Sequence, residues 1–224
     1  MGKGGAWNVM LAGAPGEIIA YTDSDVLFSP NWLKRSVEIL ETFPNVGMVT
    51  ARPFRTPPEF YESTLQWARD NATLEEGQFI PWETFLEFNL SLGQTEEENR
   101  KVYAETKDWR ITFRRPERSD REQAEGAQSK DVVAYAGASH WQFTAYKSTL
   151  QQFLPFDMDK PMGQVRQLDK RMNDAGLLRL MVSDPLAMNM SNTLGYLRGE
   201  LKGGEKKKRV SFGKRVLELG PVKK

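Results

Sequence analysis

Apolar positions along the chain fall into short continuous runs and helically spaced stripes. The run over residues 18–21 predicts a strand buried on both faces of a parallel sheet, because such strands lack the alternation of half-exposed ones. Apolar side chains three or four residues apart predict an amphipathic helix over about residues 31–42. Further strands are expected over 46–50 and 132–135, and a further helix over about 59–70. Strands and helices therefore alternate, which is typical of an α/β protein.

An aromatic segment follows these first elements. Phe79, Trp82, Phe85 and Phe88 recur at intervals of three residues, which is helical spacing. Packing in the core is the favoured interpretation of this pattern, and a platform on which sugars stack is the alternative. Both interpretations place a helix at these residues.

Residues 95–131 are charged and poor in aliphatic side chains, with arginines and carboxylates interleaved. Mixed signs predict a solvated loop that is partly disordered. Long loops in a compact domain are also often functional, so a mobile lid over the donor or the acceptor of a reaction is the alternative.

Composition narrows the class of protein. The 224 residues carry a formal net charge of +1 and are 39% apolar, which predicts one folded domain with a possible small appendage. The absence of cysteine excludes a disulfide framework and a zinc–thiolate site. There is no run of 18 apolar residues, and residues 1–5 do not resemble a signal peptide. We therefore expect a cytoplasmic protein.

The last segment differs in charge from the rest of the chain. Residues 197–224 carry ten Lys or Arg against three Glu, a net charge of +7. The cluster at 206–209 resembles a juxtamembrane basic segment, which predicts attraction to an anionic membrane surface. A solvated tail is the alternative. Nucleic acid is not expected as a partner, because Phe212 is the only aromatic residue among these charges.

Two carboxylates directly follow the first predicted strand. Asp23 and Asp25 stand one residue apart at its carboxyl end, and this edge is where ligands bind in open α/β sheets. Their oxygens suit a hard divalent cation such as Mg or Mn, which bridges carboxylates to phosphates. The pattern therefore predicts a site for a metal and a nucleotide diphosphate. Asp-Ser-Asp at a strand end is also typical of an ordinary turn, which is the alternative.

Several segments form a series along the chain: Gly4–Asn8, Ala14–Val26, Pro30–Leu33, Val46–Thr50, Gly137–Phe143 and Leu168–Leu180. In this order they resemble a family 2 glycosyltransferase. The resemblance implies an α/β protein of GT-A fold, with a mixed sheet flanked by helices. We expect a partial GT-A domain over residues 1–196, which includes the charged segment, and a basic tail over 197–224.

The resemblance also implies an N-terminally truncated domain. In that family a strand, helix, strand, helix unit holds the nucleotide and precedes the Asp-x-Asp sequence, which here begins at Asp23. We expect that a second chain supplies this unit, or that the chain is a fragment or a remnant.

The resemblance assigns two groups of binding residues: Asp23, Ser24 and Asp25 for the donor, and Gly137, Ala138, His140 and Trp141 for the acceptor. Asp25 is the more direct metal ligand by this resemblance. Small side chains before His140 let the backbone approach a ligand closely, and Trp141 offers a ring face to a sugar. His140 is the only histidine of the chain, and a packed, hydrogen-bonded histidine is the alternative.

The general base of the family comes from an acidic pair that opens a late helix. Gln164 and Val165 occupy the matching places and do not accept a proton at neutral pH. Asp169, later in the same helix, is the first remaining candidate, and Asp157 and Asp159 in the preceding loop are the alternatives.

A second departure from the family concerns the metal. Many relatives have a histidine where Asn189 stands, and that histidine can contact the metal or the diphosphate. The amide oxygen of Asn189 would be a weaker ligand for a hard cation.

Two hypotheses follow. The first is an enzyme that uses a divalent cation to transfer a sugar, with inversion, from a nucleotide-sugar donor to a saccharide, lipid or small polar acceptor. The second is a degenerate, non-catalytic GT-A module that binds a partner chain or a sugar. A phosphatase ranks third, because the expected threonine and lysine signature does not stand out.

Overall fold

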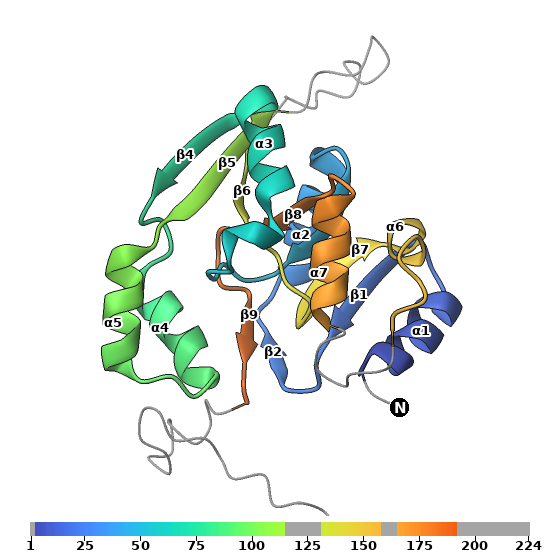
Figure 1. The fold of residues 1–224 in the computed structure, drawn as a ribbon, viewed down its shortest axis with the longest axis horizontal. Coiled ribbons are helices and arrows are strands. Elements are labelled where there is room, and N and C mark those ends of the chain that lie inside the picture. Colours follow the sequence, from blue (N-terminus) through green and yellow to red (C-terminus); the bar gives the residue numbers. More distant parts are fainter. Residues whose placement is uncertain (1–2, 115–130, 158–164, 192–224) are drawn as a thin grey trace, which may run out of the picture.

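The computed structural model describes residues 3–114, 131–157 and 165–191. Its seven α-helices in these ranges are α1 (Lys3–Gly13), α2 (Trp32–Thr42), α3 (Glu62–Asn71), α4 (Trp82–Ser91), α5 (Glu96–Glu105), α6 (Lys147–Gln151) and α7 (Val165–Asp174), with a 3₁₀ turn at Pro58–Phe60. The strands are β1 (Ile18–Thr22), β2 (Val26–Phe28), β3 (Val46–Thr50), β4 (Thr73–Gly77), β5 (Asp108–Arg114), β6 (Asp131–Ala136), β7 (Gln142–Tyr146), β8 (Leu178–Met181) and β9 (Ala187–Asn189). Figure 1 shows these elements as one mixed α/β body.

Seven strands form one mixed sheet in the order β1-β7-β3-β8-β6-β5-β4. Only the β3–β8 pair is parallel among the described strands, and the other neighbours are antiparallel. Strands β2 and β9 form a separate antiparallel pair. This mixed sheet with flanking helices confirms the expected α/β class and is consistent with a GT-A-like fold.

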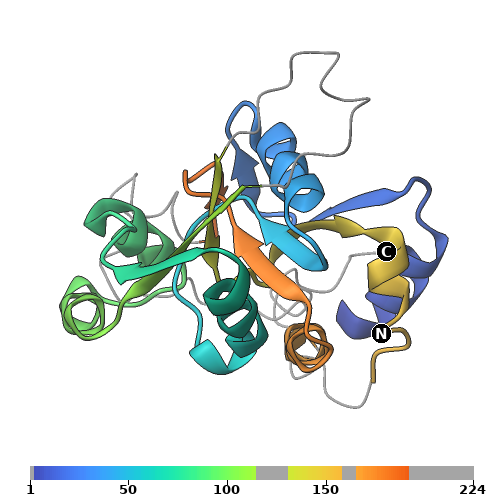
Figure 2. The same ribbon diagram turned by 90° about the horizontal axis from the view of Figure 1, so that it is seen from above.

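The sheet packs against helices on both faces. Seen from above in Figure 2, α2 lies over one face, while α3 and α7 lie on the other. Strand β6 shows the resulting alternation, because Val132 and Ala134 belong to one buried apolar cluster while Val133 and Tyr135 pack with the other. This two-sided burial explains why the inner strands read as apolar runs.

Strand β1 differs from its prediction. It is formed by residues 18–22, as expected, but it lies at an edge of the sheet and pairs antiparallel with β7. Its side chains are only partly buried or exposed, so the expectation of a strand buried on both faces of a parallel sheet is wrong. Tyr21 explains part of the apolar run, because its ring stacks on Phe143 and meets Trp7 of α1 edge-on.

Local patterns predicted other elements well. The expected helices over 31–42 and 59–70 correspond to α2 and to the turn at Pro58–Phe60 followed by α3. The aromatic segment forms α4, in which Phe85 and Phe88 are buried, so core packing is confirmed for these two rings.

The charged segment is more ordered than expected. Residues 96–105 form α5 and residues 108–114 form β5, so the expectation of a loop is wrong for this part. A capping box explains the helix, since Thr95 and Glu98 satisfy each other's backbone N–H groups. Residues 115–130 lie outside the described residues.

Candidate active site

Asp23 and Asp25 lie in the turn that joins β1 to β2, at the edge of the large sheet. The backbone N–H of Asp23 donates to the carbonyl oxygen of Trp141 at 3.0 Å, which extends the β1–β7 ladder by one bond. The next hydrogen bond along the chain joins the N–H of Met190 to the carbonyl oxygen of Asp25 at 2.7 Å. The turn is therefore fixed on both sides by backbone hydrogen bonds.

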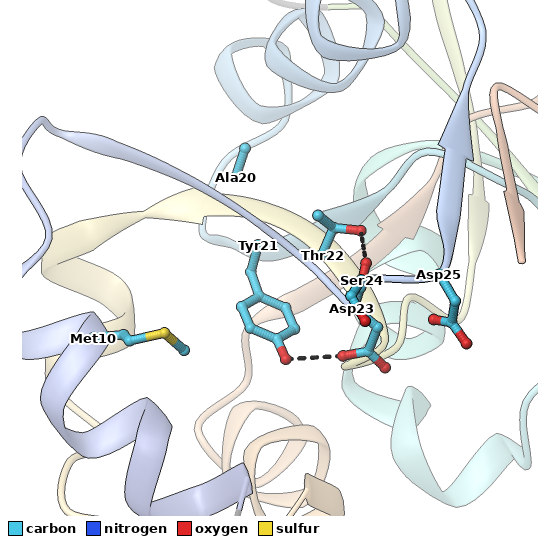
Figure 3. Close-up of a pocket in the computed structure, with 7 residues that line it drawn as sticks. All are labelled: Met10, Ala20, Tyr21, Thr22, Asp23, Ser24 and Asp25. Atoms are coloured by element: carbon cyan, nitrogen blue, oxygen red, sulfur yellow. Dashed lines mark hydrogen bonds between the residues drawn. The ribbon is translucent and has the colours of Figure 1, made fainter.

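A tyrosine of strand β1 fixes the side chain of Asp23. The hydroxyl of Tyr21 donates to Oδ1 of Asp23 at 2.8 Å (Figure 3). Burial is the main cause that raises the pKa of Tyr21 above its usual value, and the nearby charge of Asp23 acts in the same direction. The hydroxyl therefore stays protonated and remains a donor to the carboxylate.

A cavity of about 600 Å³ adjoins this turn. Its lining consists of one methionine from α1 and a continuous stretch from β1 into the turn: Met10, Ala20, Tyr21, Thr22, Asp23, Ser24 and Asp25. Figure 3 shows the carboxylates of Asp23 and Asp25 projecting to the same side of the chain. The three residues predicted to bind a donor therefore line one cavity together.

Asn189 lies beside this turn, as the metal hypothesis requires. Asn189 pairs with Val26 in the β2–β9 ladder. The next residue, Met190, donates its backbone N–H to Asp25. Its Oδ1 accepts a hydrogen bond from the backbone N–H of Ser191 at 2.9 Å. The amide oxygen is thus already engaged, and its role as a ligand stays a prediction.

The donor set at the turn fits a magnesium or manganese ion that is shared with a ligand. No group of three or more His, Cys, Asp or Glu side chains that could hold a metal occurs within residues 3–114, 131–157 and 165–191. Two carboxylates at one cavity are enough for Mg²⁺, which keeps several waters and takes further oxygens from phosphates. The geometry thus suits a cation that binds together with a diphosphate.

The second group of predicted residues surrounds His140. Nδ1 of His140 lies 2.7 Å from Oδ2 of Asp169, and Oδ1 of Asp169 accepts a bond from Nη2 of Arg179 at 2.8 Å. Asp169 is 4% exposed and Arg179 is fully buried. Burial lowers the pKa of the Arg179 guanidinium, and the negative charge of Asp169 opposes this change. The structure therefore brings together a predicted base and a predicted acceptor residue.

Gly137 and Ala138 are positioned by the fold. Gly137 has φ +117°, and a Cβ atom there would lie 2.7 Å from Oγ1 of Thr56. Ala138 is fully buried, and its carbonyl oxygen accepts a hydrogen bond from Arg179. These contacts explain the small side chains without a ligand, so acceptor binding by both residues stays a prediction.

Trp141 is packed in the core. It is 8% exposed, and its ring lies against Phe54 and Phe88 with centroid distances of 5.9 and 5.5 Å. The expectation that it offers a ring face to a sugar is therefore not supported by its position. His140, whose side chain is 22% exposed, is the more accessible residue of this strand start.

Of the two alternative bases, Asp157 lies within the described residues. Asp157 is 68% exposed, and its Oδ2 lies 3.7 Å from Nη2 of Arg171. Asp159 and Gln164 lie outside the described residues.

Arg179 was not predicted as a site residue. A lone arginine inside an apolar strand is the sequence signal that could have revealed this buried charge pair.

The chain is thus a mixed α/β protein in which two neighbouring carboxylates line one cavity at the edge of the sheet. Residues 1–96 match the sequence model of the family described as Glycosyl transferase family 2. The matched segment is therefore similar to family 2 glycosyltransferases, and it includes Asp23 and Asp25.

A curated relative agrees with this family. An uncharacterized glycosyltransferase from Nostoc sp. (strain PCC 7120) is 42% identical over 48 residues. The match covers 21% of this chain and 15% of the relative. No solved structure matches the chain.

No helix within the described ranges is both long and apolar enough to cross a membrane. The basic segment 197–224 lies outside these ranges, so its attraction to a membrane surface stays a prediction.

Proposed function

We propose that the chain acts in the transfer of a sugar from a nucleotide-diphosphate donor to an acceptor hydroxyl, with a divalent cation at Asp23 and Asp25. One observation carries this proposal: both carboxylates line the same cavity, inside the segment that matches the glycosyltransferase family. Asp23 and Asp25 would hold the cation, which when bound would supply positive charge against the departing diphosphate. Tyr21 holds Asp23 in position.

The proposed acceptor is a saccharide, a lipid or a small polar molecule that carries a free hydroxyl. Inversion at the anomeric carbon is part of the proposal. In a single displacement, a base activates the acceptor on one face of the sugar while the diphosphate leaves from the opposite face. A second chain that completes the donor site is a further part of it.

Calorimetry tests the metal and diphosphate site. Titration of UDP, and separately GDP, into the chain with Mn²⁺ is expected to release heat that Asp25→Ala removes. Asp70→Ala is the matched control, because Asp70 is an exposed carboxylate on α3 outside the cavity lining. Unchanged binding by Asp25→Ala would place the metal elsewhere.

The alternative is a non-catalytic module that binds a sugar or a partner chain. It is favoured by Gln164 and Val165, which stand where the resembling family has its acidic pair. Incubation with radiolabelled UDP-glucose and related nucleotide sugars separates the two functions. Release of the sugar supports the enzyme, while binding without release supports the module.

A further inference from the structure

His140 and Asp169 come from distant segments and meet in the folded chain. His140 precedes β7, Asp169 lies in α7, and Nδ1 of the ring is 2.7 Å from Oδ2 of the carboxylate. The hydroxyl of Ser139 lies further from the same nitrogen, at 3.4 Å. Asp169 is therefore the principal partner of Nδ1.

Asp169 is itself fixed by a buried arginine. Nη2 of Arg179 donates to Oδ1 at 2.8 Å, and the same guanidinium donates to the carbonyl oxygens of Phe60 and Ala138. A buried charge of this kind is retained only when it is paired and hydrogen-bonded. The guanidinium occupies one carboxylate oxygen and leaves the other for the imidazole.

This network determines which ring nitrogen carries the proton. An ionised carboxylate only accepts hydrogen bonds, so Nδ1 of neutral His140 must be the protonated nitrogen. Nε2 then presents a lone pair. No residue in the described part of the chain hydrogen-bonds to Nε2, and the side chain is 22% exposed.

His140 lies at the same end of the β1–β7 pair as the carboxylates. The neighbouring Trp141 accepts the backbone hydrogen bond from Asp23. The ring of Trp7 bridges the two groups, with centroid distances of 5.2 Å to Tyr21 and 6.5 Å to His140. His140 does not line the proposed donor cavity, but it contacts the ring of Trp7, which in turn contacts the cavity residue Tyr21.

We propose that Nε2 of His140 accepts the proton of the acceptor hydroxyl, and that Asp169 is a positioning residue rather than the base. The inference rests on the proposed sugar transfer. As the acceptor oxygen bonds to the anomeric carbon, its proton passes to Nε2. The bond from the anomeric carbon to the diphosphate oxygen breaks, and its electron pair leaves with the diphosphate. The imidazolium formed is stabilised by the carboxylate of Asp169.

Long-range ¹H–¹⁵N spectroscopy tests the geometry without turnover. His140 gives the only histidine signals of the chain, so the spectrum needs no assignment. The neutral ring is expected to show the Nδ1–H form, and Asp169→Asn is expected to change it. A wild-type spectrum of the Nε2–H form would overturn the inference, whether or not the variant folds.

Kinetics tests the role in transfer by the full chain. His140→Ala is expected to lower kcat by about 100- to 10,000-fold, as for loss of a general base. Binding of Mn²⁺ and UDP, measured by calorimetry, is expected to stay unchanged. Added imidazole is expected to restore part of the rate, which a purely structural role would not allow. Asp169→Asn is expected to lower kcat with little change in KM.

Asp174→Asn is the matched control and is expected to keep the wild-type rate, because Asp174 is an exposed carboxylate at the end of the same helix, where it pairs with Lys170. An unchanged rate in His140→Ala, beside an active wild-type chain, contradicts the base assignment alone. A wild-type chain that neither binds UDP nor releases a sugar contradicts the proposed function instead.

Discussion

The hydroxyl of Tyr21 donates to Oδ1 of Asp23, so the strand that ends in the carboxylate also orients it. Both residues line the cavity, and the ring of Tyr21 is fixed by Trp7 and Phe143. The aromatic contacts of the sheet edge are thereby connected to the proposed metal site.

Tyr21→Phe is expected to weaken Mn²⁺ binding by about 10- to 100-fold, as for loss of a group that orients a metal ligand. The ring remains packed, so the loss is confined to the hydrogen bonds of the hydroxyl with Asp23 and Trp7. Calorimetry with Mn²⁺ and UDP measures the change. Tyr146→Phe is the matched control, because Tyr146 lies at the opposite end of the β1–β7 pair, across from Ile18. Equal affinity in both variants would show that Asp23 needs no support from Tyr21.

Gly137→Ala separates a structural role from a ligand-binding role. The left-handed φ of +117° and the approach of Thr56 both oppose a Cβ atom at this position. The free energy of unfolding is expected to fall by about 1–3 kcal/mol, which urea denaturation measures. Gly13→Ala is the control, because a Cβ atom there meets nothing within 4 Å. It is expected to be neutral or to stabilise the protein by up to about 1 kcal/mol.

Sequence patterns predicted the elements that local periodicity defines. The apolar stripe over 31–42 gave α2, and the pattern over 46–50 gave β3, because each spacing matches one backbone geometry. The position of β1 at the sheet edge was missed, since strand order depends on pairing with β7, more than a hundred residues away along the chain.

The candidate site was predicted unevenly for the same reason. Asp23 and Asp25 adjoin one strand end, so their proximity follows from the sequence itself. His140 lies in the loop before β7, and it contacts Asp169 of α7. Arg179 of β8 forms an ion pair with the same carboxylate. No local spacing encodes such a contact. The capping box at Thr95 and Glu98 was readable from the sequence but was not used, and the loop prediction failed there.

The basic cluster at 206–209 is expected to bind anionic vesicles. Each charge near such a surface contributes about 1 kcal/mol, so replacing all four residues by Gln should weaken binding more than about tenfold at low salt. Co-sedimentation with phosphatidylserine vesicles measures this. Phosphatidylcholine vesicles and high salt serve as controls. Equal binding of both forms to anionic vesicles would assign the attraction to another part of the chain.

The final prediction concerns the ion pair between Arg55 and Asp108, which joins α4, α5 and β5. Nε of Arg55 donates to Oδ1 of Asp108 at 2.7 Å, and Oδ2 of Asp108 accepts the backbone N–H groups of Phe79 and Ile80 at 2.9 Å each. The guanidinium also lies over the rings of Phe85 and Tyr103. Nη2 of Arg55 also donates to Oδ2 at 3.2 Å, so Asp108 accepts from four donor groups at one buried point.

Asp108→Ala is expected to lower the free energy of unfolding by about 3–5 kcal/mol, because removing one partner of a buried pair leaves the other charge uncompensated. Urea denaturation followed by circular dichroism measures this loss. Glu75→Ala is the matched control, since Glu75 forms an ion pair of 2.8 Å with Arg110 on the surface of the same sheet. Solvent screens that pair, so its unfolding midpoint is expected to stay close to that of the wild type. An equal loss of stability in the two variants would show that burial does not make the Arg55–Asp108 pair more stabilising than the surface pair.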